Sequence, residues 1–296
     1  MALKVINVNK SYGLKKVVNN ITFELEKPQV YGLLGTNGAG KTTTIRMILG
    51  ILKKDEGEIS WNDKVVSRKN VKFGYLPEER GIYPKTKVKD QLMYFAQLKG
   101  MNTQIAKQEL EYWAKRLEVQ EYLNMSAEKL SKGNQQKVQF ITAVIHNPEL
   151  IILDEPFSGL DPVNTEIIKS VILELVSKGK YIIMSGHQMS SIEEFCKDII
   201  ILDKGNTVLQ GNLKKIKDQY KANKIIISSE SNIDKYINEL GLKIYFSKDN
   251  EYEIDIKNEQ EGYDLFNVLA ENKIKVNKFE LKKPTLHDIF IEKVGK

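Results

Sequence analysis

The sequence predicts an α/β fold built on a parallel sheet, followed by a smaller α+β module. The first observation is a glycine-rich stretch, residues 35–43, between a strand-like apolar run and a helix-like run. The second is a pair of uninterrupted apolar runs, residues 150–153 and 181–184, of the kind that buried parallel strands require. The third is the order of strand and helix signals after residue 220, which is βαββαβ.

The glycine-rich stretch matches the pattern GxxxxGK[ST] of a phosphate-binding loop. Its glycines let several backbone N–H groups point at one anion, and the following helix adds its unpaired N–H groups and the positive end of its dipole. Lys41 is then placed to reach the β- and γ-phosphates, and the Thr42 hydroxyl to ligate Mg²⁺. We therefore expect a nucleoside triphosphate to bind at Gly35, Thr36, Asn37, Gly38, Ala39, Gly40, Lys41, Thr42 and Thr43.

The composition narrows the class of protein. A chain of 296 residues with 41% hydrophobic content is long enough for two domains with packed cores. The net charge of +6 comes from scattered lysine pairs mixed with acids, which favours solvated lysine over a nucleic-acid surface. The single cysteine, Cys196, excludes an internal disulfide and fits a reducing compartment. Because no apolar stretch approaches about 18 residues and no signal-peptide pattern is present, we expect a soluble, cytoplasmic protein.

Two strands, residues 3–8 and 21–25, are predicted ahead of the loop strand. Tyr12 lies between them, where its ring can stack on a nucleotide base, although by itself an ordinary half-buried tyrosine is the better interpretation. After the phosphate loop and its helix, a strand that begins at Val71 leads into a loop broken by two prolines.

From Val88 to about Tyr122 the hydrophobic pattern is helical and contains no strand signal. It predicts a helical insertion in the α/β domain. The first apolar face of this block is expected to consist of Leu92, Phe95, Ala96 and Leu98.

A further helix is predicted from Ser131 through His146. Ser131 is a suitable N-cap, and Gly133 keeps the backbone at the helix start open to a ligand. This segment alone is better interpreted as a plain capped helix. The buried strand that follows, however, ends in Asp154 and Glu155, at the edge where α/β sheets place their ligands. There Asp154 can hold Mg²⁺ opposite Thr42, and Glu155 can orient and deprotonate an attacking water.

A tight turn that contains Asp161 and a helix over residues 163–177 come next. The strand after it, residues 181–185, leads to His187. A lone histidine after a strand is usually structural, but after this series of motifs His187 is better interpreted as a sensor of the γ-phosphate.

Taken in order, the phosphate loop, the proline-bearing loop, LSKGNQQK, LIILDEP, SGLD and the final histidine resemble the ATP-binding subunit of ABC transporters. The resemblance covers residues 1–215. It implies an ABC ATPase domain over that range, with a helical subdomain at about residues 85–135, and it implies ATP and Mg²⁺ as ligands. It also implies that Tyr12 stacks on adenine, that Glu155 is the general base and that His187 is the switch histidine.

The resemblance further implies that two ATPase chains close head to tail over two ATP molecules. The signature residues Ser131, Lys132, Gly133, Asn134 and Gln135 would contact the ATP held by the opposite chain, with Asp161 near the seam. Hydrolysis would reopen the pair, and the helical block would pass the motion to a transmembrane permease. The ATPase would then lie on the cytoplasmic face of the cell membrane. Whether two copies pair, or one copy with a related chain, stays open.

This sequence departs from the family pattern in three places. Glu78 stands where a glutamine normally contacts Mg²⁺ and water, and as a charged oxygen ligand it is expected to keep the metal contact. Lys132 and Asn134 replace the usual glycine and glutamine of the signature. Gly186 replaces the usual threonine before the histidine. These changes leave hydrolysis as the expected activity.

The tail, residues 220–296, is predicted to form a ferredoxin-like accessory domain. Its ending, PTLHDIFIE, and the loop motif GYLPEERGIYP resemble ATPase subunits of the ABC-2 exporter group, which includes NatA-type sodium exporters and antibiotic exporters.

The leading hypothesis is therefore an ATPase that energises export through a separate membrane subunit. The alternative is a soluble ABC ATPase that acts on nucleic acid or ribosomes. Proteins of that kind usually carry long coiled-coil or zinc insertions, or two ATPase halves, and this sequence has one half, no zinc cysteines and no sustained heptads. No nucleic-acid partner is expected. A nucleotide-binding regulator without catalysis would lack Glu155 or His187, and both are present.

Overall fold

The computed structural model describes residues 3–67, 71–79, 81–186 and 189–295. The chain forms two compact units, Met1–Gly211 and Asn212–Lys296, which are described separately below. In the described residues, none of the helices is both long enough and apolar enough to cross a membrane.

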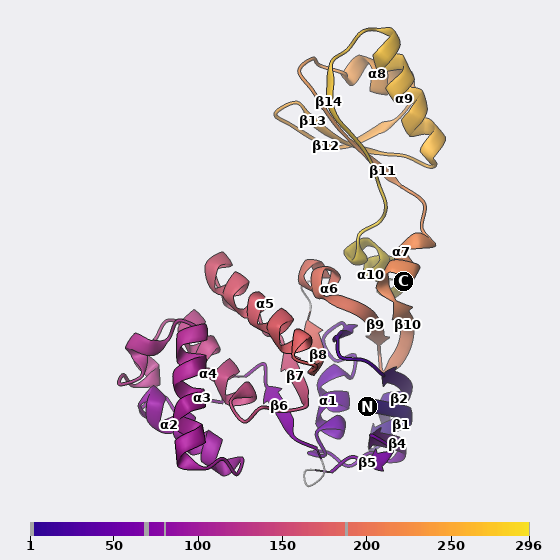
Figure 1. Cartoon of the computed structure of the whole chain (residues 1–296). Coiled ribbons are helices and arrows are strands. Elements are labelled where there is room, and N and C mark those ends of the chain that lie inside the picture. The colour runs from indigo at the N-terminus through magenta and orange to yellow at the C-terminus, as the bar shows by residue number, and fades with distance from the viewer. Residues whose placement is uncertain (1–2, 68–70, 80, 187–188, 296) are drawn as a thin grey trace. The chain divides into compact units, whose positions relative to one another are not determined.

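A six-stranded sheet with the order β10-β9-β3-β8-β7-β6 lies at the centre of the first unit (Figure 1). Neighbouring strands from β6 to β9 run parallel, so their carboxyl ends meet at one edge of the sheet. Every residue of β3, β7 and β8 is buried, as expected for strands covered on both faces. The strands are β3 Val30–Gly35, β6 Phe73–Leu76, β7 Leu150–Asp154, β8 Tyr181–Gly186, β9 Cys196–Asp203 and β10 Asn206–Asn212.

A second sheet of the first unit is antiparallel and has the order β2-β1-β4-β5. Its inner face joins helix α1, Lys41–Ile48, and the central sheet in one hydrophobic core. The strands are β1 Leu3–Tyr12, β2 Lys15–Leu25, β4 Glu56–Trp61 and β5 Lys64–Val65. The two strands predicted before the loop strand are therefore confirmed and are longer than the sequence pattern indicated.

The remaining helices of the first unit include the predicted helical block. They are α2 Val88–Leu98, α3 Thr103–Arg116, the 3₁₀ turns η1 Gln120–Tyr122 and η2 Ala127–Lys129, α4 Lys132–Val144, α5 Pro162–Ser177 and α6 Met189–Phe195. The block is divided after α2 at Gly100, whose φ of 84° is left-handed. Leu92 and Ala96 are fully buried, but the prediction for Leu98 is wrong, because this side chain is 65% exposed at the end of α2.

Helix α3 of the helical block is clamped to α5 by one carboxylate, Glu174. Arg116 Nε donates to Glu174 Oε2 at 2.7 Å, and Lys178 Nζ donates to Oε1 at 2.6 Å. The Tyr112 hydroxyl also donates to Oε1, at 2.5 Å. Burial by itself would raise the pKa of Glu174, but these hydrogen bonds outweigh it and lower the pKa to about 2.

Replacing Glu174 with glutamine is expected to lower the free energy of unfolding by about 1–2 kcal/mol near neutral pH. Because the folded pKa lies below the ordinary value of 4.5, the carboxylate stabilises the fold above pH 4.5 and loses this effect as the pH falls toward 2. The difference between wild type and variant should therefore shrink across that range. Urea unfolding at a series of pH values measures it, with the exposed Glu111→Gln on α3 as control. A difference independent of pH would contradict the role of the charge.

The second unit contains an antiparallel sheet of order β12-β13-β11-β14. Its elements are α7 Leu213–Asp218, β11 Lys224–Ser229, α8 Asp234–Glu239, β12 Lys243–Lys248, β13 Glu251–Asp255, α9 Glu259–Glu271, β14 Val276–Lys282 and α10 Leu286–Val294. The predicted order βαββαβ and the predicted hairpin are confirmed, with Asp249 and Asn250 at positive φ in the turn between β12 and β13. Helices α8 and α9 complete a separate hydrophobic core.

Candidate nucleotide site

The loop between β3 and α1 has a conformation that requires glycine at two positions. Gly35 has a φ of 151°, and a Cβ there would lie 2.4 Å from the carbonyl oxygen of Leu202. Gly40, the residue before α1, has a φ of 101°, and a Cβ there would lie 2.7 Å from the carbonyl oxygen of Val17. The curled backbone is thus wedged between β2 and β9, which holds its N–H groups in place at the start of the helix.

Lys41 lies across this loop and is surrounded by negative charge. Its ammonium donates to the carbonyl oxygens of Gly35 at 2.8 Å and Thr36 at 3.1 Å. Burial lowers the pKa of Lys41, and the charges of three carboxylates oppose this effect. In order of strength these belong to Glu155, Asp154 and Glu78. The fold therefore brings the ammonium of the loop lysine near three of the four predicted acidic residues.

Asp154 is the last residue of β7 and lies beside Ser185 of β8 in the parallel register. Both side chains are buried, and the Ser185 hydroxyl donates a hydrogen bond to Asp154 Oδ1. Burial raises the pKa of Asp154, and the hydrogen bond from Ser185 opposes this. Sequence reasoning missed Ser185. A serine that ends a buried strand was visible, but its partner depends on which strand lies next to β7.

Glu155 follows with a φ of 54°, an unfavourable value for a residue with a side chain. The Glu155 N–H donates to the carbonyl oxygen of Ser185 at 3.1 Å, and the Ser158 N–H donates to the carbonyl oxygen of Glu155 at 3.1 Å. This turn keeps Glu155 at the carboxyl edge of the sheet, where strained backbone is typical of functional residues. Its Oε2 lies 3.8 Å from the position that a Cβ on Gly186 would take. The predicted switch histidine, His187, lies outside the described residues.

The predicted Mg²⁺ ligands are all oxygen donors at this edge. Thr42 lies in the first turn of α1, Asp154 ends β7, and Glu78 follows β6 in the proline-bearing loop. Among the residues that the structure describes, no three acidic, histidine or cysteine side chains gather closely enough to hold a metal by themselves. Mg²⁺ usually binds one or two carboxylates together with substrate phosphates and water, so this donor set fits the ion.

The signature residues lie at the start of α4 rather than in the phosphate loop. Ser131 is the N-cap of α4 and accepts a hydrogen bond from the Asn134 N–H at 3.2 Å. Gly133 is buried, and a Cβ there would lie 3.1 Å from the Asn164 amide nitrogen. Asn164 in turn donates its backbone N–H to Asp161, the N-cap of α5, at 2.9 Å. The structure thus places the signature and the turn of Asp161 side by side. The rest of the signature forms the first turn of α4 and consists of Lys132, Asn134 and Gln135.

Two buried glutamines of α4 connect this helix to loops at the sheet edge, and sequence reasoning missed both. Gln136 Nε2 donates to the carbonyl oxygen of Pro156, directly after Glu155, at 3.2 Å. Gln139 Nε2 donates to the carbonyl oxygens of Pro77 and Glu79 at 3.2 and 3.0 Å. Gln139 therefore holds the residues on either side of Glu78, and Gln136 holds the residue after Glu155.

Tyr12 ends β1 with 54% of its surface exposed, so its ring is accessible to a ligand. The Lys10 ammonium lies 5.6 Å from the ring centre. An exposed aromatic ring beside a cation suits a flat, electron-rich ring system such as a nucleotide base.

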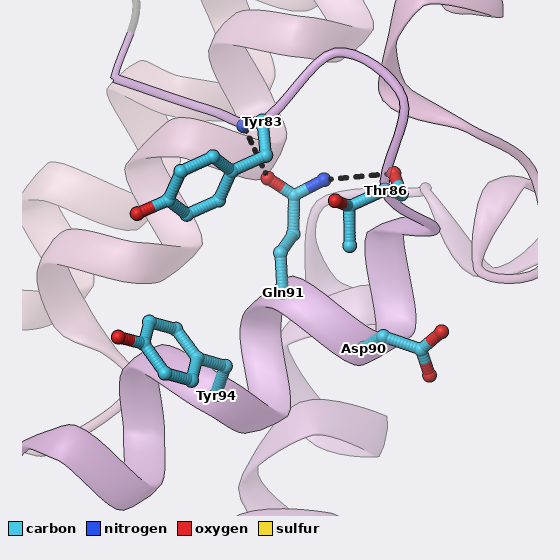
Figure 2. A pocket seen from close by; sticks show the side chains of 5 residues that line it. All are labelled: Tyr83, Thr86, Asp90, Gln91 and Tyr94. Carbon is cyan, nitrogen blue, oxygen red and sulfur yellow. Dashed lines mark hydrogen bonds between the residues drawn. The ribbon is translucent and has the colours of Figure 1, made fainter.

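A cavity of about 440 Å³ lies beside α2, at the end of the proline-bearing loop (Figure 2). Gln91 on α2 is buried; it accepts from the Tyr83 N–H and donates to the carbonyl oxygen of Thr86, both at 3.2 Å. Tyr83 and Tyr94 border the cavity with 52% and 51% of their surfaces exposed. Asp90 completes the lining. The loop is thus fixed to α2, with two accessible aromatic rings beside the hollow.

Comparison with known proteins gives matches along both units. A model of the ABC transporter family matches residues 18–158, and a model of the C-terminal domain of DrrA1-3-like ATP-binding proteins matches residues 211–294. The chain is 47% identical over 294 residues to the uncharacterized ABC transporter ATP-binding protein YhaQ of Bacillus subtilis. The aligned region covers 99% of this chain and 98% of YhaQ. It is 34% identical over 209 residues to the ABC transporter ATP-binding protein NatA of Bacillus subtilis (68% and 84% of the two chains).

A third relative is the Nod factor export ATP-binding protein I of Bradyrhizobium diazoefficiens, 29% identical over 224 residues (74% and 73% of the two chains). Among solved structures, an ATP-binding subunit of an ABC transporter matches with a TM-score of 0.68 at 29% identity, over 74% of this chain and 93% of that one. The dimeric structure of MJ0796, a bacterial ABC transporter cassette, matches with a TM-score of 0.65 at 22% identity, over 71% and 98% of the two chains. The predicted fold class and the resemblance derived from the motifs are confirmed.

Proposed function

This chain belongs to the family of ABC transporter ATP-binding proteins, and we propose that two copies of it hydrolyse Mg-ATP to energise an exporter through a separate membrane subunit. ATP hydrolysis itself is the activity of the family. The observation that carries the proposal is that the carboxyl edge of the sheet holds Lys41, which begins α1 after β3, Asp154 and Glu155 at the end of β7, and Glu78 after β6. The family relationship favours this function over an ATPase that acts on nucleic acid or ribosomes.

Each residue of the site has a proposed task in hydrolysis. The N–H groups of the loop and the Lys41 ammonium bind the β- and γ-phosphates, so that Lys41 leaves its two loop carbonyls and neutralises charge that develops on the γ-phosphate. Glu155 orients the attacking water and accepts its proton. Tyr12 stacks on the adenine. His187, next to Gly186, contacts the γ-phosphate.

The donor set at this edge is proposed to hold Mg²⁺ through the Thr42 hydroxyl, Asp154 and Glu78. When bound, the ion withdraws negative charge from the β- and γ-phosphates. Ser185 fixes the Asp154 carboxylate for this task, because its hydroxyl occupies one of the two carboxylate oxygens. The other oxygen is the one proposed to contact the ion.

Pairing of two copies is proposed to complete each site. In that arrangement Ser131, Lys132, Gly133, Asn134 and Gln135 of one copy contact the ATP held by the other. The backbone at the start of α4 offers N–H groups to an anion. The contact between Gly133 and Asn164, which is bonded to Asp161, supports a seam in which both segments face the second copy. The solved relative MJ0796 is described as dimeric.

The cavity beside α2 is the proposed docking place for a helix of the permease, which puts the ATPase at the cytoplasmic face of the membrane. Tyr83 and Tyr94 offer exposed aromatic surface there, of the kind that interfaces use. A single loop connects this cavity to Glu78, and Gln139 and Gln91 hold its two ends. A change at the γ-phosphate can therefore move the docking surface. Export as the direction of transport is supported by the relative that is named a Nod factor export ATP-binding protein.

Purification of the chain with its membrane fraction in mild detergent tests this function. A polytopic membrane protein is expected to co-purify in stable stoichiometry and to change the rate of ATP hydrolysis. The double variant Tyr83→Ser/Tyr94→Ser should lose this partner and keep ATP binding, because both rings line the cavity beside α2 and no residue of the phosphate loop does. Tyr263→Ser, an exposed tyrosine of α9, is the matched control. Co-purification of RNA or DNA instead of a membrane protein would overturn the proposal.

A further inference from the structure

A second cavity of the first unit, of about 320 Å³, lies between the helical block and the end of α5. Its lining includes Tyr112 and Trp113 of α3, together with Lys178 and Lys180, which follow α5. Asn147, in the loop before β7, borders it as well. Lys180 directly precedes β8. The cavity therefore lies at the amino ends of the parallel strands, on the edge opposite to the nucleotide site.

The positive charge of this cavity is arranged for an anion. Lys178 is held in place by Glu174 at 2.6 Å and by the Tyr112 hydroxyl at 3.1 Å. Lys180 is partly buried, and its ammonium makes no ion pair or hydrogen bond with the described residues. Burial lowers the pKa of Lys180; Glu149 opposes this, while the neighbouring Lys72 and Lys178 reinforce it. A bound anion would relieve that repulsion.

The rest of the lining suits an apolar body attached to such an anion. Val144, Pro148 and Leu175 are buried and apolar. The indole of Trp113 is 95% buried, since only 5% of its surface is exposed, and its N–H has no hydrogen-bond partner among the described residues. A buried donor left without a partner is unusual in a folded protein. Glu109 is the one carboxylate of the lining, against two lysines.

We propose that this cavity binds a small organic anion, a carboxylate or phosphate attached to an aromatic or apolar body. The anion pairs with Lys180 beside the fixed Lys178, and the body packs on Trp113, Val144 and Leu175. Such a ligand bridges α3 of the helical block and the end of α5, the two elements that Glu174 clamps together. The site goes beyond the proposed function and does not depend on it.

Nuclear magnetic resonance of the full chain, labelled with ¹⁵N in its tryptophans, tests the site. The sequence holds two tryptophans, and Trp61→Phe assigns the indole signal of Trp113. With the nucleotide site saturated by Mg-ADP, phenyl phosphate and benzoate are titrated as probes, and benzyl alcohol serves as the neutral analogue. The Trp113 signal should shift in a saturable manner with at least one of the two anions and not with the alcohol. The anion that binds more tightly distinguishes a phosphate ligand from a carboxylate ligand.

The matched variants are Lys180→Gln and Lys243→Gln, the latter an exposed lysine of β12. Loss of the charge-assisted contact should weaken the binding of the preferred anion about tenfold or more in Lys180→Gln, and not in Lys243→Gln. Thermal unfolding checks that both variants are folded. The proposal is overturned by a Trp113 signal that neither anion shifts, by equal binding of benzyl alcohol, or by a folded Lys180→Gln variant that binds as tightly as wild type.

Discussion

Glu155→Gln is expected to slow ATP hydrolysis by about 10²–10⁴-fold, the usual contribution of a general base. The glutamine amide is nearly the same size as the carboxylate, and the backbone N–H of residue 155 can still donate to the carbonyl oxygen of Ser185. The amide, however, accepts no proton from water. ATP binding should therefore be unchanged or tighter, because a negative charge beside the γ-phosphate has been removed. The variant should accumulate as the closed pair of chains.

Steady-state phosphate release measures the rate, and light scattering with and without Mg-ATP measures the pairing. Glu166→Gln, an exposed carboxylate of α5, is the control and should behave as wild type. A shift from monomer to dimer with ATP would support composite sites in which Ser131 of one copy faces Lys41 of the other. A persistent monomer with ATP bound would argue against self-pairing and for a different ATPase partner.

Lys41→Ala is expected to weaken ATP binding by about 100-fold or more, since each charge-assisted hydrogen bond to a phosphate is worth about 1.5–3 kcal/mol. Hydrolysis should be undetectable, because the substitution also removes the cation that stabilises the γ-phosphate during transfer. In the present structure the ammonium donates to the carbonyl oxygens of Gly35 and Thr36, so the side chain extends across the loop to the residues at its start.

Calorimetric titration with ATP and with ADP separates the contribution of Lys41 to binding the γ-phosphate from its contribution to binding the β-phosphate. Affinity for both nucleotides should fall, and the loss should be larger for ATP. Lys15→Ala, an exposed lysine of β2, controls for a general change in charge. Near-normal ATP affinity in a folded Lys41→Ala protein would contradict the assignment of the loop.

The sequence predicted most of the elements because their signals are local. The phosphate loop needs glycines at fixed spacing between a strand and a helix, and all three parts are adjacent in the chain. Buried parallel strands are recognisable in the sequence as apolar runs, and β7 and β8 are examples. The tail was predicted as a module from its order of elements, and Asp249 and Asn250 supply the turn that its hairpin requires.

The wrong prediction for Leu98 and the residues that sequence reasoning missed have a common cause: they depend on contacts between segments that are distant in the chain. Leu98 fits the helical pattern of α2, but none of the described segments covers its side chain, which remains exposed. Ser185, Gln136 and Gln139 carry no signal of their own, because the first finds Asp154 across the sheet and the others find the carbonyl oxygens of loops about 20 and 60 residues away in the chain.

By itself, the sequence determined the chemical groups of the site, the family, and the elements on which each group lies. Only the tertiary structure decided which groups meet. The strand order β9-β3-β8-β7-β6 puts Lys41, Asp154, Glu155 and Glu78 at one edge, and the packing of α3 against α5 forms the cavity of Trp113 and Lys180 at the other. The physical reason is that parallel strands align their carboxyl ends in any order. Which strands become neighbours in the sheet depends on burial summed over the whole core.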